Sequence, residues 1–278
     1  MFTCHISQSF KFSFVIAVLL LVVTDYCFCI NTKSINASLA GGFGPAIATW
    51  YGDPNGAGST GGACGFGNDV TNPTYNSLIS AGNQALFKSG KGCGACYQVK
   101  CTQNPQCSRS PITVTITDEC PGSCNNDPIH FDLSGKAFGY LAKPGQADAL
   151  RNAGRINIEY KKVPCNFNAR LTFKIDKGSN PFYLAFAVEY LSGDGEIGSI
   201  EISSSNSNGW RAMQRLLVQP GKLTYLRRKR SFFVRRITTL ESRTTIVAPN
   251  VIRLTGLQAN TIIYERTFLY YISRVEDS

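Results

Sequence analysis

Short stretches in which apolar and polar residues alternate dominate the hydrophobic pattern of the chain. Residues 112–116 (ITVTI) and 156–160 (INIEY) have an apolar residue at every second position. A period of two puts these side chains on one face, as in a half-buried strand. Residues 41–95 are dense in Gly, Asn, Ser and Thr, a composition typical of turn-rich beta structure. The pattern therefore predicts an all-β barrel or sandwich.

One segment departs from this alternation and predicts a short helix. Ser134 can cap its N-terminus, and Pro144 lies beyond its end. Between them, Ala137, Phe138 and Leu141 supply an apolar face. We expect this helix to pack on the barrel.

The composition changes after Cys165, which indicates a second domain. No cysteine follows this residue, and residues 171–175 (LTFKI) open a new alternating pattern that continues to residue 202. A chain of 278 residues that is 43% hydrophobic is long enough for two domains with separate cores. We expect a first domain over 31–166 and a second over 167–278. Because no Gly/Ser-rich linker separates them, the two domains should lie close together.

The N-terminal residues have the pattern of a secretory signal peptide. An apolar run over 12–23, broken only by Ser13, follows Lys11. This run is shorter than the roughly 20 residues that a membrane-spanning helix needs. We expect residues 1–30 to be removed on secretion and no integral membrane segment in the mature chain; a membrane anchor is the alternative. Asn36 begins a glycosylation sequon, Asn-Ala-Ser.

Eight cysteines remain once the expected signal peptide is removed, and none lies after residue 165. An even number in an oxidising compartment predicts a disulfide framework. The spacing of Cys93 and Cys96, together with Cys120 and Cys124, would also suit zinc, but secretion favours oxidation. We therefore expect disulfides, no metal and no cofactor. The eight are Cys64, Cys93, Cys96, Cys101, Cys107, Cys120, Cys124 and Cys165.

The positive charge of the chain is concentrated in one segment. Residues 216–236 contain seven basic and no acidic residues, and without these seven the net charge falls from +10 to +3. Strong basicity suggests an acidic partner such as nucleic acid or pectin. That inference depends here on one segment alone, so we expect no nucleic acid partner.

Carboxylates beside aromatic residues are the main candidates for chemistry. His130 is the one histidine left after removal of the signal peptide, which excludes a histidine-rich metal site. A pair of carboxylates is the working part of a glycosidase, and a flat ring can cover the apolar face of a sugar. Each aspartate could equally serve a turn, and each ring could belong to the core. The candidates are Asp53, Asp118 and Asp132, with Trp50 and Tyr51.

Six short strings follow one another in a distinctive order: TWYG (49–52), GGACGFG (61–67), GCGACY (92–97), ITDEC (116–120), HFDLS (130–134) and KGSNP (177–181). In order and spacing they resemble the beta-expansins, over about residues 40–215 and again over 237–252. The resemblance implies a six-stranded double-psi beta-barrel, similar to barwin and to family 45 glycoside hydrolases, and then an immunoglobulin-like beta-sandwich that binds polysaccharide. It also implies a secreted, monomeric plant cell-wall protein. Such a protein disrupts non-covalent contacts between cellulose, xylan or other matrix glycans without hydrolysis.

The resemblance also assigns roles to single residues. Asp132 matches the general acid of the hydrolases. The implied groove of the first domain is lined by Thr49, Tyr51, Asp118, His130 and Asp132, and the implied sugar-facing aromatic residues are Trp50, Tyr51 and Tyr183. The implied disulfides join Cys64 to Cys93, Cys96 to Cys165 and Cys101 to Cys107, which leaves Cys120 to pair with Cys124.

Hydrolysis would need a second carboxylate beside Asp132. In an inverting hydrolase the acid and the base lie about 6.5–9.5 Å apart. Asp53 follows Thr49 at a spacing similar to that of the hydrolases' base, but the Pro-Asn-Gly turn after it would point it into solvent. Asp118 is the other candidate base. We expect a non-hydrolytic protein; an endoglucanase-like hydrolase and a barwin-type binding or defence protein are the alternatives.

Part of the second domain departs from the family pattern. Residues 210–215 begin a motif that continues in the family with Trp-Gly and a second Trp, but the basic segment 216–236 follows instead. The match returns at 237–242 and is lost again over 253–278. The basic segment could be a polyanion-binding insertion, a divergent pair of strands, or the product of reading-frame shifts in the gene model. We favour frame shifts because the similarity stops and restarts without a change in length.

Overall fold

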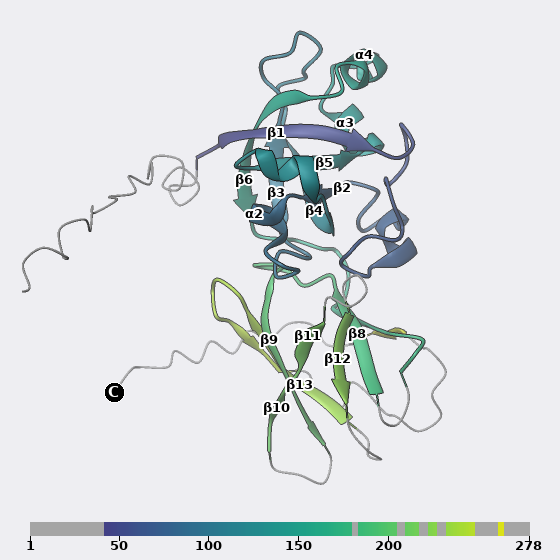
Figure 1. The fold of residues 1–278 in the computed structure, drawn as a ribbon, viewed down its shortest axis with the longest axis vertical. Helices are drawn as coiled ribbons and strands as arrows, with labels where there is room; N and C mark the ends of the chain where they lie inside the picture. Colours follow the sequence, from purple (N-terminus) through teal and green to yellow (C-terminus); the bar gives the residue numbers. More distant parts are fainter. Residues whose placement is uncertain are drawn as a thin grey trace, which may run out of the picture.

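A closed beta-barrel and two further beta-sheets make up the part of the molecule that the structure describes (Figure 1). The computed structural model describes residues 42–179, 183–204, 209–216, 222–226, 232–247 and 261–263. The barrel lies at the top of Figure 1 and the two sheets at the bottom. The expected signal peptide and Asn36 lie outside the described residues. Within the described ranges, no helix has the length and apolar character needed to cross a membrane.

The barrel has six strands: β1 (Gly44–Tyr51), β2 (Ile79–Gly82), β3 (Cys96–Lys100), β4 (Ile112–Glu119), β5 (His130–Ser134) and β6 (Ile156–Val163). They close in the order β1-β5-β2-β4-β3-β6. The pairs β1–β5 and β2–β4 are parallel, and the other pairs are antiparallel. Closure leaves the barrel without a free strand edge. The six-stranded closed barrel expected for the first domain is confirmed.

The alternation of apolar residues places the barrel core. In β6, Ile156 and Ile158 are buried while Asn157 between them is exposed. In β4, Val114 and Ile116 are buried in the same cluster. Burying a large apolar side chain stabilises a fold by about 1.5–3 kcal/mol. Both strands predicted from the period of two are therefore confirmed, and their apolar faces hold the barrel together.

Short helices cover the outside of the barrel: η1 (Gly67–Thr71), α2 (Gln84–Phe87), η2 (Gly122–Asn126), α3 (Gly135–Tyr140) and α4 (Ala147–Asn152). The predicted helix is α3, and Ser134 is its N-cap. Ser134 Oγ accepts a hydrogen bond from the Ala137 N–H at 3.0 Å. Ala137 and Phe138 are fully buried in the barrel core. The hydrophobic pattern did not predict α4, which packs against α3.

Two sheets form the second domain. The first has the order β10 (Arg211–Ala212), β9 (Ile197–Ser204), β13 (Phe232–Thr239), β14 (Thr245–Ile246), and the second β11 (Gln214–Leu216), β12 (Lys222–Leu226), β8 (Tyr183–Glu189), β7 (Thr172–Ile175), β15 (Thr261–Ile263). Ile200 and Ile237 of the first sheet share a buried cluster with Phe173 and Phe186 of the second. This arrangement confirms a beta-rich second domain. Parts of the basic segment 216–236 form β12 and the beginning of β13.

The two domains are in direct contact. The Tyr75 ring of the first domain lies 5.0 Å from that of Tyr190 and 5.6 Å from that of Phe167, centroid to centroid. Beside these rings, Lys174 Nζ of β7 donates to Asp69 Oδ2 of η1 at 2.5 Å. The contact fits the close packing expected from the missing linker.

A buried carboxylate strengthens the junction at another point. The Glu196 side chain is fully buried, and its two oxygens bind Lys88 Nζ at 2.8 Å and Lys162 Nζ at 2.5 Å. Lys162 also binds Glu241 Oε1 at 2.7 Å. Because Lys88 and Lys162 belong to the barrel domain, these ion pairs cross the domain junction. Loss of either lysine would leave the buried charge of Glu196 with one of these two ion-pair partners and one carboxylate oxygen without its lysine.

Four disulfides lie in the first domain: Cys64–Cys93, Cys96–Cys165, Cys101–Cys107 and Cys120–Cys124. They are the pairs that the family resemblance implied. The Cys96–Cys165 bond closes a loop with a sequence separation of 69 residues, which on a chain-entropy estimate stabilises the fold by about 4 kcal/mol. It ties β3 to the chain that enters the second domain. At the same point the backbones of Gly94 and Gly195 touch, since a Cβ on Gly195 would lie 2.3 Å from Gly94 O.

Candidate functional site

One row of residues crosses four neighbouring strands of the barrel. Thr49 of β1 pairs with Asp132 of β5, Asp132 with Ala81 of β2, and Ala81 with Asp118 of β4. Residues directly opposite one another in a sheet point to the same face. Thr49 and Asp132 are half-buried, whereas their chain neighbours Ala48 and Leu133 are fully buried in the core. The row therefore lies on the outer face of the barrel, with the small Ala81 between the two aspartates.

A β-bulge brings Asp118 into this row. Strict alternation along β4 would place Asp118 inside the barrel with Val114 and Ile116. The pairing of β4 with β2 shifts between Ser80 and Ala81, so Ile116 and Asp118 pair with adjacent residues. A bulge of this kind redirects the side chains that follow it. Asp118 thereby faces outward on the same side as Asp132.

Backbone hydrogen bonds fix the orientation of Asp118. Its Oδ1 accepts from the Ala63 N–H at 2.7 Å and from the Glu119 N–H at 2.8 Å. A Cβ on Gly62 would lie 3.2 Å from Asp118 Cγ. The loop that contains Gly62 and Ala63 therefore lies directly against this carboxylate and anchors to it.

The surroundings of Asp132 change its acidity. Burial raises the pKa of Asp132, and the negative charge of Asp118 adds to the increase. The hydrogen bond from Thr49 and the charge of His130 oppose it. Thr49 Oγ1 donates to Asp132 Oδ1 at 2.6 Å, and Cys120 Sγ lies 4.0 Å from Asp132 Oδ2. Asp132 consequently keeps its proton to a higher pH than an ordinary aspartate.

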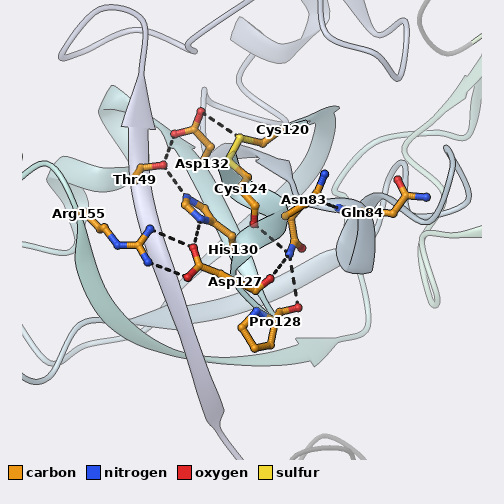
Figure 2. Close-up of polar contacts among 11 residues, drawn as sticks. Thr49, Asn83, Gln84, Cys120, Cys124, Asp127, Pro128, His130, Asp132 and Arg155 are labelled. Atoms are coloured by element: carbon orange, nitrogen blue, oxygen red, sulfur yellow. Dashed lines mark hydrogen bonds and ion pairs between the residues drawn. A yellow bond between two sulfur atoms is a disulfide. The ribbon is translucent and has the colours of Figure 1, made fainter. Parts of the chain in front are cut away.

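His130 lies behind Thr49 and is buried (Figure 2). Its Nε2 lies 2.8 Å from Thr49 Oγ1, and its Nδ1 lies 2.7 Å from Asp127 Oδ2. Asp127 in turn accepts two hydrogen bonds from the Arg155 guanidinium, at 2.7 and 3.0 Å. The Arg155 hydrogen bonds lower the pKa of Asp127 to about 2. Asp127 and Arg155 were not among the residues expected at the site.

Tyr51 closes one end of the row. It follows Thr49 on the same face of β1, and it is half-buried. Burial raises the pKa of Tyr51 well above its usual range, and the charges of Asp118 and Asp132 contribute to the increase. Gly58 packs on the ring, because a Cβ at that position would lie 2.4 Å from Tyr51 Cζ. The structure thus brings together the five residues that the resemblance assigns to the groove, Thr49, Tyr51, Asp118, His130 and Asp132.

The remaining expected residues lie outside this row. Trp50 points to the opposite face of β1, where its ring packs beside Phe138 and its Nε1–H donates to Arg151 O at 3.0 Å. It remains half-exposed. Tyr183 begins β8, and its side chain is outside the described part of the chain. Asp53 is exposed at the beginning of a turn closed by the Gly56 N–H on Asp53 O.

Known protein families match both halves of the chain. A lytic transglycolase family model matches residues 79–160, and an expansin C-terminal domain model matches residues 171–252. Expansin-B4 of Arabidopsis thaliana is 48% identical over 241 residues, which are 86% of this chain and 91% of the relative. Expansin-B3 of Oryza sativa subsp. japonica is 46% identical over 234 residues, 82% of this chain and 84% of the relative.

Solved structures of a bacterial expansin share the fold. The apo expansin of Clavibacter michiganensis aligns with 79% of this chain and 94% of its own, at a TM-score of 0.58 and 19% identity. A mutant of that expansin in complex with cellohexaose aligns with 80% of this chain and 96% of its own, at a TM-score of 0.60 and 18% identity. The hydrolase and barwin-type alternatives are not favoured by these matches. The chain belongs to the beta-expansins, and the expected wall-loosening, non-hydrolytic protein is confirmed at the level of this family.

Proposed function

We propose that the outer row of the barrel binds a strand of wall polysaccharide and displaces it from its neighbours without cleaving it. The observation that carries this proposal is the alignment of Thr49, Asp132 and Asp118 on one outer face, next to Tyr51. Hydroxyl and carboxyl groups at regular strand spacing can exchange hydrogen bonds with the hydroxyls of a sugar chain. The bacterial expansin bound to cellohexaose supports an extended glucan as the ligand class.

Exchange of hydrogen bonds needs no chemical energy. Because water competes for the same groups, one hydrogen bond contributes a net of only about 0.5–1.5 kcal/mol, so replacing a bond between wall polymers by one to the protein changes the free energy little. Asp132 suits this exchange because its raised pKa extends to higher pH the range in which the carboxyl is protonated and can donate as well as accept. Slippage between polymers follows when many such exchanges accumulate.

The surroundings of the carboxylates support the lack of hydrolysis. A hydrolytic base must be free to activate a water near the acid. Asp118 Oδ1 is already bonded to the backbone N–H groups of Ala63 and Glu119. Asp53 is exposed on its turn. Asp132 therefore resembles the acid of a hydrolase whose base has no prepared position.

Secretion to the wall completes the proposal. We infer that residues 1–30 are removed on export and that the mature, monomeric protein acts on cell-wall polysaccharides outside the cell. Four disulfides in the first domain suit an oxidising compartment.

Paired assays on one preparation test this function. The protein purified from a secreting host should extend heat-killed, acidified wall strips and release no reducing ends from cellulose, xylan or mixed-linkage glucan. Asp132→Asn should reduce the extension rate to about a tenth, since the amide cannot gain and lose a proton and so cannot switch between a donating and a purely accepting form as the carboxyl does. Asp53→Asn makes the same chemical change at an exposed carboxylate and should leave extension intact. Steady release of reducing ends that both substitutions abolish would instead establish a hydrolase.

A further inference from the structure

The Thr49 hydroxyl lies between two groups that can each hold a proton. Thr49 Oγ1 is 2.8 Å from His130 Nε2 and 2.6 Å from Asp132 Oδ1. A hydroxyl carries one hydrogen, so it can donate to only one of these partners and must accept from the other. Either His130 Nε2–H donates to Thr49 and Thr49 donates to Asp132, or a protonated Asp132 donates to Thr49 and Thr49 donates to His130.

We infer that His130 and Asp132 share one mobile proton through the Thr49 hydroxyl, and that Asp127 and Arg155 are positioning residues that decide where this proton resides. In the transfer, His130 Nε2 gives its proton to Thr49 Oγ1 while Thr49 gives its own proton to Asp132 Oδ1. An imidazolium and a carboxylate become a neutral imidazole and a neutral carboxyl, with no change in total charge. This inference rests on the proposed function, because the position of the proton determines whether the Asp132 carboxyl can donate a hydrogen bond to a polysaccharide in the groove.

The other nitrogen of His130 is fixed by Asp127. The two Arg155 hydrogen bonds keep Asp127 ionised, so its Oδ2 can only accept, and His130 Nδ1 must carry a hydrogen. The exchangeable position is therefore Nε2, which faces Thr49. An outer partner that fixes one ring nitrogen in this way controls the basicity of the other.

The loop that carries Asp127 is held in place by a buried amide. Asn83 Nδ2 donates to Asp127 O at 2.9 Å (Figure 2), and the Asn83 N–H donates to His130 O at 3.1 Å. His130 is only 2% exposed, so water has little access to its ring. The Nε2 proton of His130 therefore reaches solvent through Thr49 and the half-buried Asp132 instead of directly from the ring.

The charged and titratable groups around the pair come from several elements. Asp132 faces Thr49 and Tyr51 of β1, Asp118 of β4 and the Cys120 sulfur. His130 faces Thr49 on one side and Asp127, with Arg155 behind it, on the other. Asp118 disfavours a second negative charge on Asp132, whereas Asp127 favours a positive charge on His130. The two outer carboxylates thus pull the shared proton in opposite directions.

Asp127 and Arg155 carry opposite charges, so their substitutions should shift the titration midpoint of Asp132 in opposite directions. Asp127→Asn removes the anion that stabilises the imidazolium, so the proton should move to Asp132 and the midpoint of its titration should rise by about one pH unit. Arg155→Gln removes a nearby positive charge, so the imidazolium gains and the Asp132 midpoint should fall. The measurement is an NMR titration of the Asp132 carboxyl carbon and the His130 ring nitrogens in the full secreted protein.

Thr49 variants separate the relay from a general electrostatic effect. In a Thr49→Val background both shifts at Asp132 should shrink to about a third or less, while Thr49→Ser should preserve them. Glu159→Gln, which breaks an ion pair with Lys100 on another part of the barrel, is the matched control and should move neither signal. Unchanged Asp132 midpoints in the Asp127 and Arg155 variants, or equal shifts with and without the Thr49 hydroxyl, would overturn the inference.

The inference can still be tested if one variant does not fold or if the protein does not extend wall strips. If Asp127→Asn does not fold, Arg155→Gln still tests the inference, because Arg155 is 53% exposed in its side chain. If the wild-type protein extends no wall strip, the proposed function fails while the titration result stands by itself. A coupled titration together with wall extension that follows the Asp132 midpoint would support both.

Discussion

At the scale of single residues, glycine sets how closely the loop after β1 approaches the groove. Gly58 has a φ of +78° and touches the Tyr51 ring, and a Cβ on Gly52 would lie 2.5 Å from Gly58 Cα. Backbone packed this tightly on an aromatic ring has no room for any side chain. The loop thereby holds Tyr51 against the row of polar residues.

We predict that Gly58→Ala destabilises the protein by about 2–4 kcal/mol, from backbone strain and a clash with Tyr51. Gly145→Ala is the matched control. Gly145 has a φ of +73°, but a Cβ there would meet nothing within 4 Å. It should cost only the strain, about 1–2 kcal/mol. Denaturant unfolding measures both, and equal costs would show that contact with Tyr51 is unimportant.

At the scale of elements, α3 depends on its first residue. Ser134 Oγ accepts from the Ala137 N–H at 3.0 Å and donates to Ser77 O at 2.6 Å. Both bonds are buried, so they join the helix to the chain that precedes β2.

Ser134→Ala should therefore lower the free energy of unfolding by about 1–3 kcal/mol. Ser108→Ala removes a hydroxyl that accepts an exposed hydrogen bond from the Ser110 N–H, and it should change stability by less than about 0.5 kcal/mol. Thermal unfolding of the two variants beside the wild type gives the comparison. A loss below about 0.5 kcal/mol for Ser134→Ala would contradict the capping role.

Elements in which apolar residues recur at the spacing of a strand or of a helix could be predicted from the sequence. Irregular elements could not. The strand at 156–160 and the helix after Ser134 have the expected spacing and cap. Alternation along β4 would place Asp118 inside the barrel, but a β-bulge turns its side chain outward. Asp127 and Arg155 are 28 residues apart, and only the closed barrel brings Arg155, just before β6, to the loop before β5. No local signal connects them.

The frame-shift hypothesis for the basic segment makes its own prediction. If it is correct, reading the nucleotide sequence across residues 216–236 in another frame should restore a Trp-Gly pair, as the family pattern has it. A transcript that encodes the residues as written would refute the hypothesis. The strands β12 and β13 would then be the divergent but folded alternative.

At the scale of the whole molecule, a buried acid lies at the domain junction. The Glu189 side chain is fully buried, 3.8 Å from Lys174 Nζ. Burial, and then the negative charge of Asp69, raises the pKa of Glu189 to about 8. The folded protein thus favours the protonated acid, whereas the unfolded chain ionises near its ordinary pKa of 4.5.

Stability should consequently depend on pH through Glu189. Its contribution is complete below about pH 4.5 and is lost as the pH rises to about 8, by about 1.4 kcal/mol per pH unit. Glu189→Gln should remove this slope from the unfolding free energy measured between pH 5 and 8. Glu201→Gln, at a partly exposed ion pair with Arg236, should keep it. Parallel pH profiles for wild type and Glu189→Gln would contradict the prediction.

The position of the Cys96–Cys165 bond has a mechanical consequence. Cys165 forms paired backbone hydrogen bonds with Gly193, at 2.7 and 2.9 Å, where the second domain begins. If each domain holds a different polymer, tension between the polymers reaches Cys165 and passes through a covalent bond into β3. The load therefore bypasses the hydrogen bonds of β6, which would otherwise peel away first. Because this covalent connection limits how far the protein can extend under tension, the force would act to separate the polymers and not to unfold the domain junction.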